Sequence, residues 1–214
     1  MGQIFVLEDP RMGSNCYGIE EAGKVLLIDP NDGRKIINFM EQKGWEPQLI
    51  LLTHEHCDHM YGLNEIREKY HPQVVATKAC SDNLKNHVKN MSGLMGMYLH
   101  FRNGSNEDWR WQPILCEAAE ITFQREYACI WQGHQIWMKA LPGHTEGSCG
   151  IVIDQKYLFS GDYLIREEEV ITGFPGGDAD LYEKVSKPWL KEYGMQFHIY
   201  PGHGKDYAGN EARI

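Results

Sequence analysis

The chain has 214 residues, of which 42% are hydrophobic and 24% are charged, the balance of an ordinary globular protein. This length suits one domain over residues 1–214, with a core large enough to be stable without crosslinks. The net charge of −9 and the lack of a Lys/Arg-rich run disfavour a nucleic-acid partner, and no apolar run is long enough to cross a membrane.

The cysteines are scattered along the chain and form no C-x-x-C pair, which disfavours a structural zinc knuckle. They are Cys16, Cys57, Cys80, Cys116, Cys129 and Cys149. In a chain of this size, scattered cysteines are typical of free thiols in a reducing compartment. The N-terminus lacks the charged and apolar regions of a secretory signal. We therefore expect a cytoplasmic protein.

Strands and helices alternate in the first half of the chain. Strands are predicted over residues 3–7, 24–29, 49–52 and 74–76. The second and third are continuous apolar runs, as expected for strands buried on both faces. Helical spacing of apolar residues appears at Ile36, Ile37 and Met40 and again over residues 60–70. This order predicts a sheet covered by helices.

The second half is richer in strands. Consecutive strands are predicted over residues 120–141 and 149–160, with short turns between them. A helix is predicted over residues 179–193. A last strand over residues 197–200 leads into Pro201-Gly202-His203-Gly204.

Residues 81–113 are long for a connection in a compact domain. They are rich in methionine and aromatic side chains: Met91, Met95, Met97, Tyr98, Phe101, Trp109 and Trp111. One interpretation is a functional lid over a binding site, and the other is a helical pair packed on the core. The sequence leaves both open.

Four side chains of metal-binding type fall within six residues, at His54, His56, Asp58 and His59, directly after a buried strand. Two histidines two residues apart project to one side where the chain leaves a strand, so they can share a metal. The other two come from the next turn of backbone and can address a second position. Imidazole and carboxylate ligands suit zinc, or iron and manganese in a harder environment. A zincin helix is excluded, because H-E-x-x-H needs histidine where Asp58 stands.

The run from Thr53 to His59 resembles the signature of the metallo-β-lactamase superfamily, and further motifs of that family follow in the expected order. These are Asp29 after the second strand, Pro142-Gly143-His144-Thr145, Ser160-Gly161-Asp162 and Pro201-Gly202-His203-Gly204. The resemblance spans residues 15–207, and five ordered motifs make it highly specific. It implies an α/β fold, the αββα four-layer sandwich, in which two mixed sheets pack face to face with helices outside.

The resemblance also implies a site for two divalent metal ions, zinc first, with iron or manganese as alternatives. The implied ligands are three side chains for one ion, three for the other, and a bridge: His54, His56 and His144; Asp58, His59 and His203; and Asp162. Asp29 is similar to the family's structural acid, which braces the ligand loops. A hydroxide bridging two metals is available near neutral pH, and Asp58 is the expected catalytic residue that orients it.

Within the superfamily the chain resembles the glyoxalase-II-like group, through the turn Phe174-Pro175-Gly176-Gly177-Asp178 and the segment Asn15-Cys16-Tyr17. The leading hypothesis is therefore thioester hydrolysis, within a wider class of ester and related bonds. Two features depart from that group. The chain ends soon after His203, where glyoxalase II carries a further helical domain. The run from Glu167 to Glu169 would also repel an anionic tripeptide if these side chains face the site.

Two alternatives remain. Persulfide-dioxygenase-like proteins keep the motifs but use one iron, held by residues that match His54, His144 and Asp162. A non-catalytic ligand sensor of the same fold is the second. In each case the expected partner is a small molecule, with neither nucleic acid nor membrane, and the sequence carries no signal of oligomeric state. We expect Met95, Tyr98 and Phe101 to contact an apolar or aromatic part of that molecule.

Overall fold

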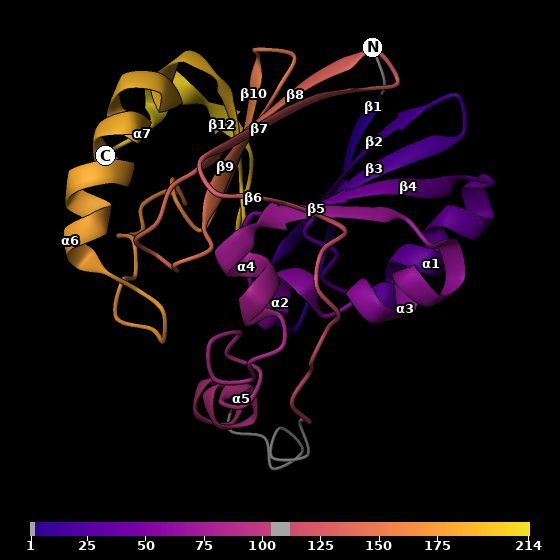
Figure 1. Cartoon of the computed structure of the whole chain (residues 1–214), viewed down its shortest axis with the longest axis horizontal. Coiled ribbons are helices and arrows are strands. Elements are labelled where there is room, and N and C mark those ends of the chain that lie inside the picture. The colour runs from indigo at the N-terminus through magenta and orange to yellow at the C-terminus, as the bar shows by residue number, and fades with distance from the viewer. Residues whose placement is uncertain (1–2, 104–111) are drawn as a thin grey trace.

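Two mixed sheets pack face to face and helices cover their outer faces (Figure 1). The computed structural model describes residues 3–103 and 112–214. The first sheet has the order β1-β2-β3-β4-β5-β6. Its strands are β1 (Gln3–Glu8), β2 (Asn15–Glu21), β3 (Lys24–Ile28), β4 (Glu46–Leu51), β5 (Gln73–Thr77) and β6 (Ile121–Phe123). The pairs β1–β2 and β2–β3 are antiparallel, and the strands from β3 to β6 run parallel to one another.

The second sheet has the order β12-β11-β10-β9-β8-β7. Its strands are β7 (Glu126–Trp131), β8 (His134–Ala140), β9 (Cys149–Ile153), β10 (Tyr157–Gly161), β11 (His198–Pro201) and β12 (Tyr207–Ala208). Only the pair β10 and β11 is parallel among its described strands. The predicted αββα four-layer fold is confirmed.

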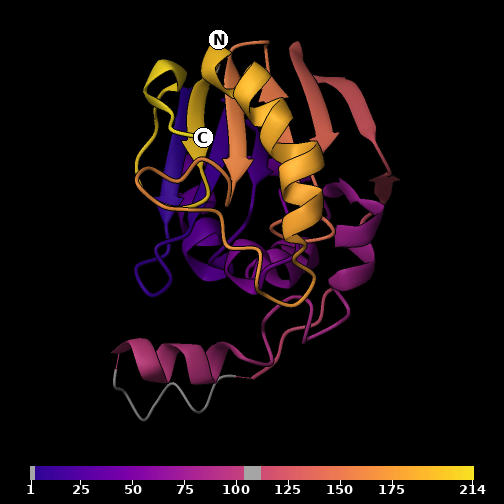
Figure 2. The same ribbon diagram turned by 90° about the vertical axis from the view of Figure 1, so that its left-hand side faces the viewer.

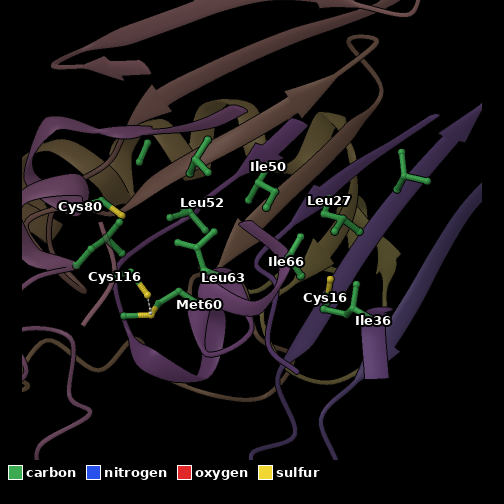
Figure 3. Packing of buried hydrophobic residues seen from close by; sticks show 14 of the residues in the cluster. Cys16, Leu27, Ile36, Ile50, Leu52, Met60, Leu63, Ile66, Cys80 and Cys116 are labelled. Carbon is green, nitrogen blue, oxygen red and sulfur yellow. Dashed lines mark hydrogen bonds between the residues drawn. The ribbon is translucent and has the colours of Figure 1, made fainter. Parts of the chain in front are cut away.

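Three apolar clusters hold the four layers together. One lies between the sheets and includes Leu51 and Ile151. The second packs the first sheet against α1 (Gly33–Lys43), α3 (Leu63–Tyr70) and α4 (Lys78–Asn83), and Figure 3 shows Leu27, Ile50 and Ile66 within it. The third packs the second sheet against α7 (Lys187–Tyr193). The central strands, such as β3 and β9, are thus buried on both faces, which explains the continuous apolar runs in the sequence.

Helix α1 shows how local signals set the element boundaries. The Asp32 side chain caps its first turn by accepting a hydrogen bond from the Lys35 amide at 3.1 Å. Gly44 ends the helix in the left-handed conformation (φ 68°), which glycine adopts without steric cost. Between these caps, Ile36 and Met40 lie on one face and are fully buried against the sheet.

Two helical segments differ in detail from the sequence-based prediction. A short helix, α2 (Cys57–Met60), begins inside the histidine run and breaks before α3, so two helices replace the single one expected over residues 60–70. The helix expected over residues 179–193 is present as α6 (Ala179–Leu181), a π-helical turn over Tyr182–Ser186, and α7. The two-residue strand β12 was too short to carry a periodic signal.

Within residues 81–113, helix α5 (Met95–Asn103) projects away from the sandwich (Figure 2). Its Met95 and Leu99 pack with Met12 and Cys57 in a small cluster separate from the three main ones. Trp109 and Trp111, named above with the insert, lie outside the described residues. Among the described helices, none has the length and apolar character needed to cross a membrane.

The separation of α5 from the main clusters gives a stability test. Replacing the fully buried Ile50 with alanine should cost about 2–5 kcal/mol of unfolding free energy, because it leaves a cavity under α1 and α3. Phe101→Ala should change it by less than about 0.5 kcal/mol, since that side chain is 78% exposed. Urea unfolding midpoints of the two variants would measure both effects. Equal losses would place α5 in the core.

Candidate metal centre

The motif residues lie in loops that meet at one edge of the two sheets. Asp29 follows β3 and the histidine run follows β4, and these strands are parallel. Asp162 follows β10 and His203 comes after β11, which are also parallel. Because parallel strands end at the same edge of a sheet, each pair of loops is brought side by side. His144, from the turn between β8 and β9, completes the group.

The first group of ligand atoms comes from His54, His56, His144 and Asp162, which all lie within 4.8 Å of one another. His56 Nδ1 is 3.1 Å from His144 Nε2, and His144 Nε2 is 3.5 Å from Asp162 Oδ2. The three imidazoles are almost completely buried. This is the spacing of side chains that surround one small cation.

The second group comes from Asp58, His59 and His203, again within 4.8 Å. Asp58 Oδ2 lies 3.6 Å from His59 Nε2 and 3.3 Å from His203 Nε2. Asp162 reaches this group with its other oxygen, since Oδ1 is 3.2 Å from His59 Nε2 and 3.7 Å from His203 Nε2. The structure therefore brings all seven expected ligands together, with Asp162 between the two groups.

Hydrogen bonds at Nδ1 leave the Nε2 atoms of three imidazoles facing the centre. His144 Nδ1 is 2.7 Å from the carbonyl oxygen of Ile171, which can only accept, so the proton is on Nδ1. His54 Nδ1 lies 3.0 Å from the Thr53 hydroxyl. Because this hydroxyl donates its proton to the Asp29 carboxylate, its oxygen is the acceptor for His54 Nδ1. His59 Nδ1 is 3.1 Å from Asp29 Oδ2. Such partners fix the tautomer and direct a lone pair at a metal.

Asp29 is the bracing residue that the sequence analysis expected. Its Oδ1 accepts the Thr53 amide at 2.8 Å, and its Oδ2 accepts the Thr53 hydroxyl at 2.5 Å and faces His59. Asp29 also forms a geometric group with His54 and His59, but its oxygens are occupied by these bonds. Its backbone is left-handed (φ 54°), a conformation that aspartate tolerates better than most residues.

The charges in the centre separate the imidazoles into two kinds. Burial lowers the pKa of His56 to about 3 and that of His54 well below its ordinary value, so both are neutral near pH 7. Burial also opposes a charge on His59, but Asp58 and Asp162 outweigh it and raise its pKa. Asp58 is the counterpart: burial disfavours its charge, yet His59 and His203 lower its pKa to about 2.

Unsatisfied polar atoms test whether a cation fits here. His54 Nε2, His59 Nε2 and Asp162 Oδ1 are buried and have no hydrogen-bond partner in the described structure. The last two approach to 3.2 Å but without hydrogen-bond geometry. Each such buried atom costs about 1–3 kcal/mol when left unpaired. Neutral imidazoles and ionised carboxylates are the donors that divalent transition metals take, so these residues fit the ions implied by the sequence.

Two glycines allow the loops to close around Asp162. A Cβ at Gly202 would lie 2.3 Å from Asp162 Oδ1 and 2.8 Å from His59 Cε1. Gly161 has φ +55°, and a Cβ there would meet the Thr53 hydroxyl at 2.8 Å. Close packing of the ligand loops therefore requires glycine at positions 161 and 202.

Glu55 is a residue of the centre that the sequence analysis missed. Its side chain is fully buried between the ligand loops, where Oε1 accepts from Asn83 Nδ2 and Oε2 from the Thr145 hydroxyl, both at 2.9 Å. Burial raises its pKa despite these two donors. Because Thr145 follows His144, Glu55 ties the His54–His56 loop to the His144 loop. Its place between two ligands was the only signal in the sequence.

A cavity of about 470 Å³ opens above the ligands, within the usual size range of small-molecule sites. His56, Asp58, His144, Asp162 and His203 line its floor. Met95 and Tyr98 of the insert contribute to the wall of the cavity, and Phe174 also lines it. Phe101 is not among the lining residues and points into solvent, where its ring lies 5.7 Å from that of His100.

The neck of the insert is closed by buried polar side chains. Asn90 Nδ2 donates to the carbonyl oxygen of Ile114 at 2.9 Å, and Ser92 exchanges two hydrogen bonds with the same residue. The Asn90 carbonyl oxygen in turn accepts the Cys57 amide at 2.8 Å. The insert is thereby attached directly to the loop that carries His56 and Asp58.

The sequence model of the metallo-beta-lactamase superfamily matches residues 9–203. The chain belongs to this superfamily. It is 28% identical over 197 residues to a probable metallo-hydrolase of Streptococcus pyogenes serotype M6, an alignment covering 90% of this chain and 79% of that one.

Two solved structures show the same fold. The BLEG-1 B3 metallo-beta-lactamase superposes with a TM-score of 0.81 at 21% identity, over 98% of this chain and 95% of that one. TTHA1623, in a di-iron-bound form, gives a TM-score of 0.73 at 22% identity, over 97% and 96% of the two chains.

Removing the Glu55 carboxylate should weaken metal binding. Glu55→Ala frees the Thr145 hydroxyl and should lower zinc affinity about 10–100-fold, the usual effect of losing a group that orients ligands. Glu146→Ala is the matched control, because that glutamate lies on the loop of His144 and Thr145 but is half-exposed and pairs with Lys89. Competition with a fluorescent chelator would measure both. Similar affinities in the two variants would contradict this role.

The metal-free protein should lose stability as pH rises above 6.5. His59 and His203 have folded-state pKa values raised above 6.5, so the stability they contribute is complete below that pH and is lost as pH rises through the folded-state values. Each contributes a slope of at most about 1.4 kcal/mol per pH unit. Urea unfolding between pH 6.5 and 8.5 in chelator would measure it. Excess zinc should reverse the trend, since metal displaces these protons; a flat profile in chelator would contradict it.

Proposed function

We propose that this chain is a metal-dependent hydrolase with two divalent ions, which cleaves an ester or thioester bond in a small molecule. The observation that carries the proposal is the position of Asp162, whose two oxygens reach separate groups of ligand atoms at the floor of an open cavity. A bridge of this kind is suited to a pair of ions about 3.5–4 Å apart.

In this proposal His54, His56 and His144 would hold one ion, Asp58, His59 and His203 would hold the other, and Asp162 would contribute to both. Divalent ions, when bound, lower the pKa of water from 15.7 to about 7 and polarise a carbonyl oxygen. No protein nucleophile is then required: burial raises the pKa of the Cys57 thiol, which lies outside the cavity lining.

Asp58 would orient the nucleophilic water in this scheme. It lines the cavity floor, and its carboxylate can accept a hydrogen bond from water held nearby. His144 and His203 enclose the floor on either side of Asp162. These residues would hold the water and the carbonyl group of the substrate close together.

Thioester cleavage is the favoured form of the reaction, and the turn that resembles the glyoxalase-II-like group supports it. Phe174 of that turn lines the cavity, and its ring centroid lies 5.8 Å from that of His56 and 6.4 Å from that of His144. It is therefore positioned to hold an acyl group against the metal ligands. A single-iron oxidoreductase keeps the same motifs, so the number of metal ions per chain is what separates the two reactions.

Zinc is the favoured metal, with iron or manganese as alternatives, and TTHA1623 is a fold neighbour with two irons. We expect about two metal equivalents per chain. Asp162→Ala should lose more metal than His56→Ala, because it removes a ligand from both ions. Elemental analysis of the three proteins would decide this. One equivalent of iron, or equal losses in the two variants, would reject the bridged pair.

The same preparations would be assayed on ester, thioester, lactone and phosphodiester substrates. We expect thioester turnover that disappears with chelator and returns with zinc. Failure on every class, with two metals bound, would instead favour a non-catalytic ligand sensor.

A further inference from the structure

Three carboxylates lie around the mouth of the cavity above the metal centre. Glu8 comes from the end of β1, and Glu168 and Glu169 from the loop after β10. All three are exposed, and within the described residues their carboxylates form no ion pair. No lysine or arginine is among the residues that line the cavity.

Three cations close to the mouth have partners elsewhere. Arg166 pairs with Glu211, and the Arg11 guanidinium with Asp9. Lys187, whose charge lies within electrostatic range of Glu169, donates to Glu183 at 2.6 Å. None of these three cations pairs with a carboxylate of the mouth, and Lys35 donates to the backbone oxygen of Glu8 and not to its carboxylate.

The cavity below these carboxylates has the character of a ligand site. His56 lines it, is only 4% exposed, and its Nε2 has no hydrogen-bond partner in the described structure. The metal ions account for Asp162 Oδ1, the other unpaired atom of the floor, but His56 faces the ligand group with Nδ1, so its Nε2 is left over. An unpaired buried polar atom beside an open cavity indicates that a bound group belongs there.

The walls between floor and mouth are apolar and aromatic. Met12, Met91 and Met95 lie on the lining, with Tyr98 and Phe174. Methionine adapts to apolar groups of varied shape, and aromatic faces attract both apolar groups and organic cations. An apolar group can therefore be buried beside the metal centre while a charged group lies at the carboxylates.

We propose that the cavity selects substrates that combine an apolar acyl group with a cationic group, such as a quaternary or protonated amine, and discriminates against anionic ones. This rests on the hydrolase function proposed above and specifies its substrate class. It also gives Glu168 and Glu169 a role as specificity residues. An anionic carrier such as glutathione is accordingly disfavoured.

Three thioesters with the same phenylacetyl group would test the proposal, with thiocholine, N-acetylcysteamine and 3-mercaptopropionate as the cationic, neutral and anionic thiols. We expect kcat/KM to fall in that order, about three- to tenfold at each step, and the steps to shrink in 1 M NaCl. The double variant Glu168→Gln/Glu169→Gln should lose most of the difference between the cationic and neutral substrates. Glu167→Gln, on the same loop but outside the cavity lining, is the matched control and should keep it.

A binding measurement separates this proposal from the hydrolase function. Calorimetry with 3-phenylpropyltrimethylammonium and its uncharged carbon isostere needs no turnover. We expect the ammonium to bind the metal-loaded protein about three- to tenfold more tightly, and this preference to disappear in the double variant but not in Glu167→Gln. If no thioester is cleaved but this preference is found, the hydrolase function fails and the charge selectivity stands. Equal binding of the two probes, or a preference that survives the double variant, overturns the proposal.

Discussion

The centre depends on hydrogen bonds that hold the back of each imidazole. His59 is held by Asp29, His54 by Thr53 and His144 by the Ile171 carbonyl oxygen, and these acceptors come from different elements. A ring that lost the acceptor at its Nδ1 would be free to rotate or to change tautomer. Ligand geometry is thus set before any ion arrives, and the sandwich supplies the rigid frame on which the acceptors are mounted.

That frame concentrates polar groups at a single edge and keeps the remaining interior apolar. The parallel pairs β3–β4 and β10–β11 end at this edge, one pair in each sheet. Two rows of loops therefore face each other across the sandwich, with His54 to His59 on one side and Asp162 and His203 on the other. Neither sheet alone carries a complete ligand group, so the centre exists only when the two halves of the chain are packed together.

Much of this could be predicted from the sequence, because ligand identity and strand burial leave strong local patterns. The four-layer fold followed from ordered motifs, and continuous apolar runs located β3 and β4. What remained hidden depends on contacts distant in sequence. Nothing near Glu55 indicates that Asn83 and Thr145 donate to it. Likewise Tyr98 and Phe101 look alike in the sequence, yet their helix directs one ring to the cavity wall and the other to solvent. The start of α2 within the ligand run was missed because ligand residues interrupt the apolar spacing.

Helix α5 is anchored to the ligand loop and not to the main core. Its Met95 and Leu99 contact Met12 and Cys57, and the backbone of Asn90 bonds that of Cys57. The insert itself is tied to the main core only before this helix, where Leu84 is fully buried against the first sheet. Changes in α5 are therefore expected to alter the wall of the cavity, to which Met95 and Tyr98 contribute, with little effect on the packing of the sandwich. The stability of the fold and the shape of this wall are thus determined by different parts of the chain.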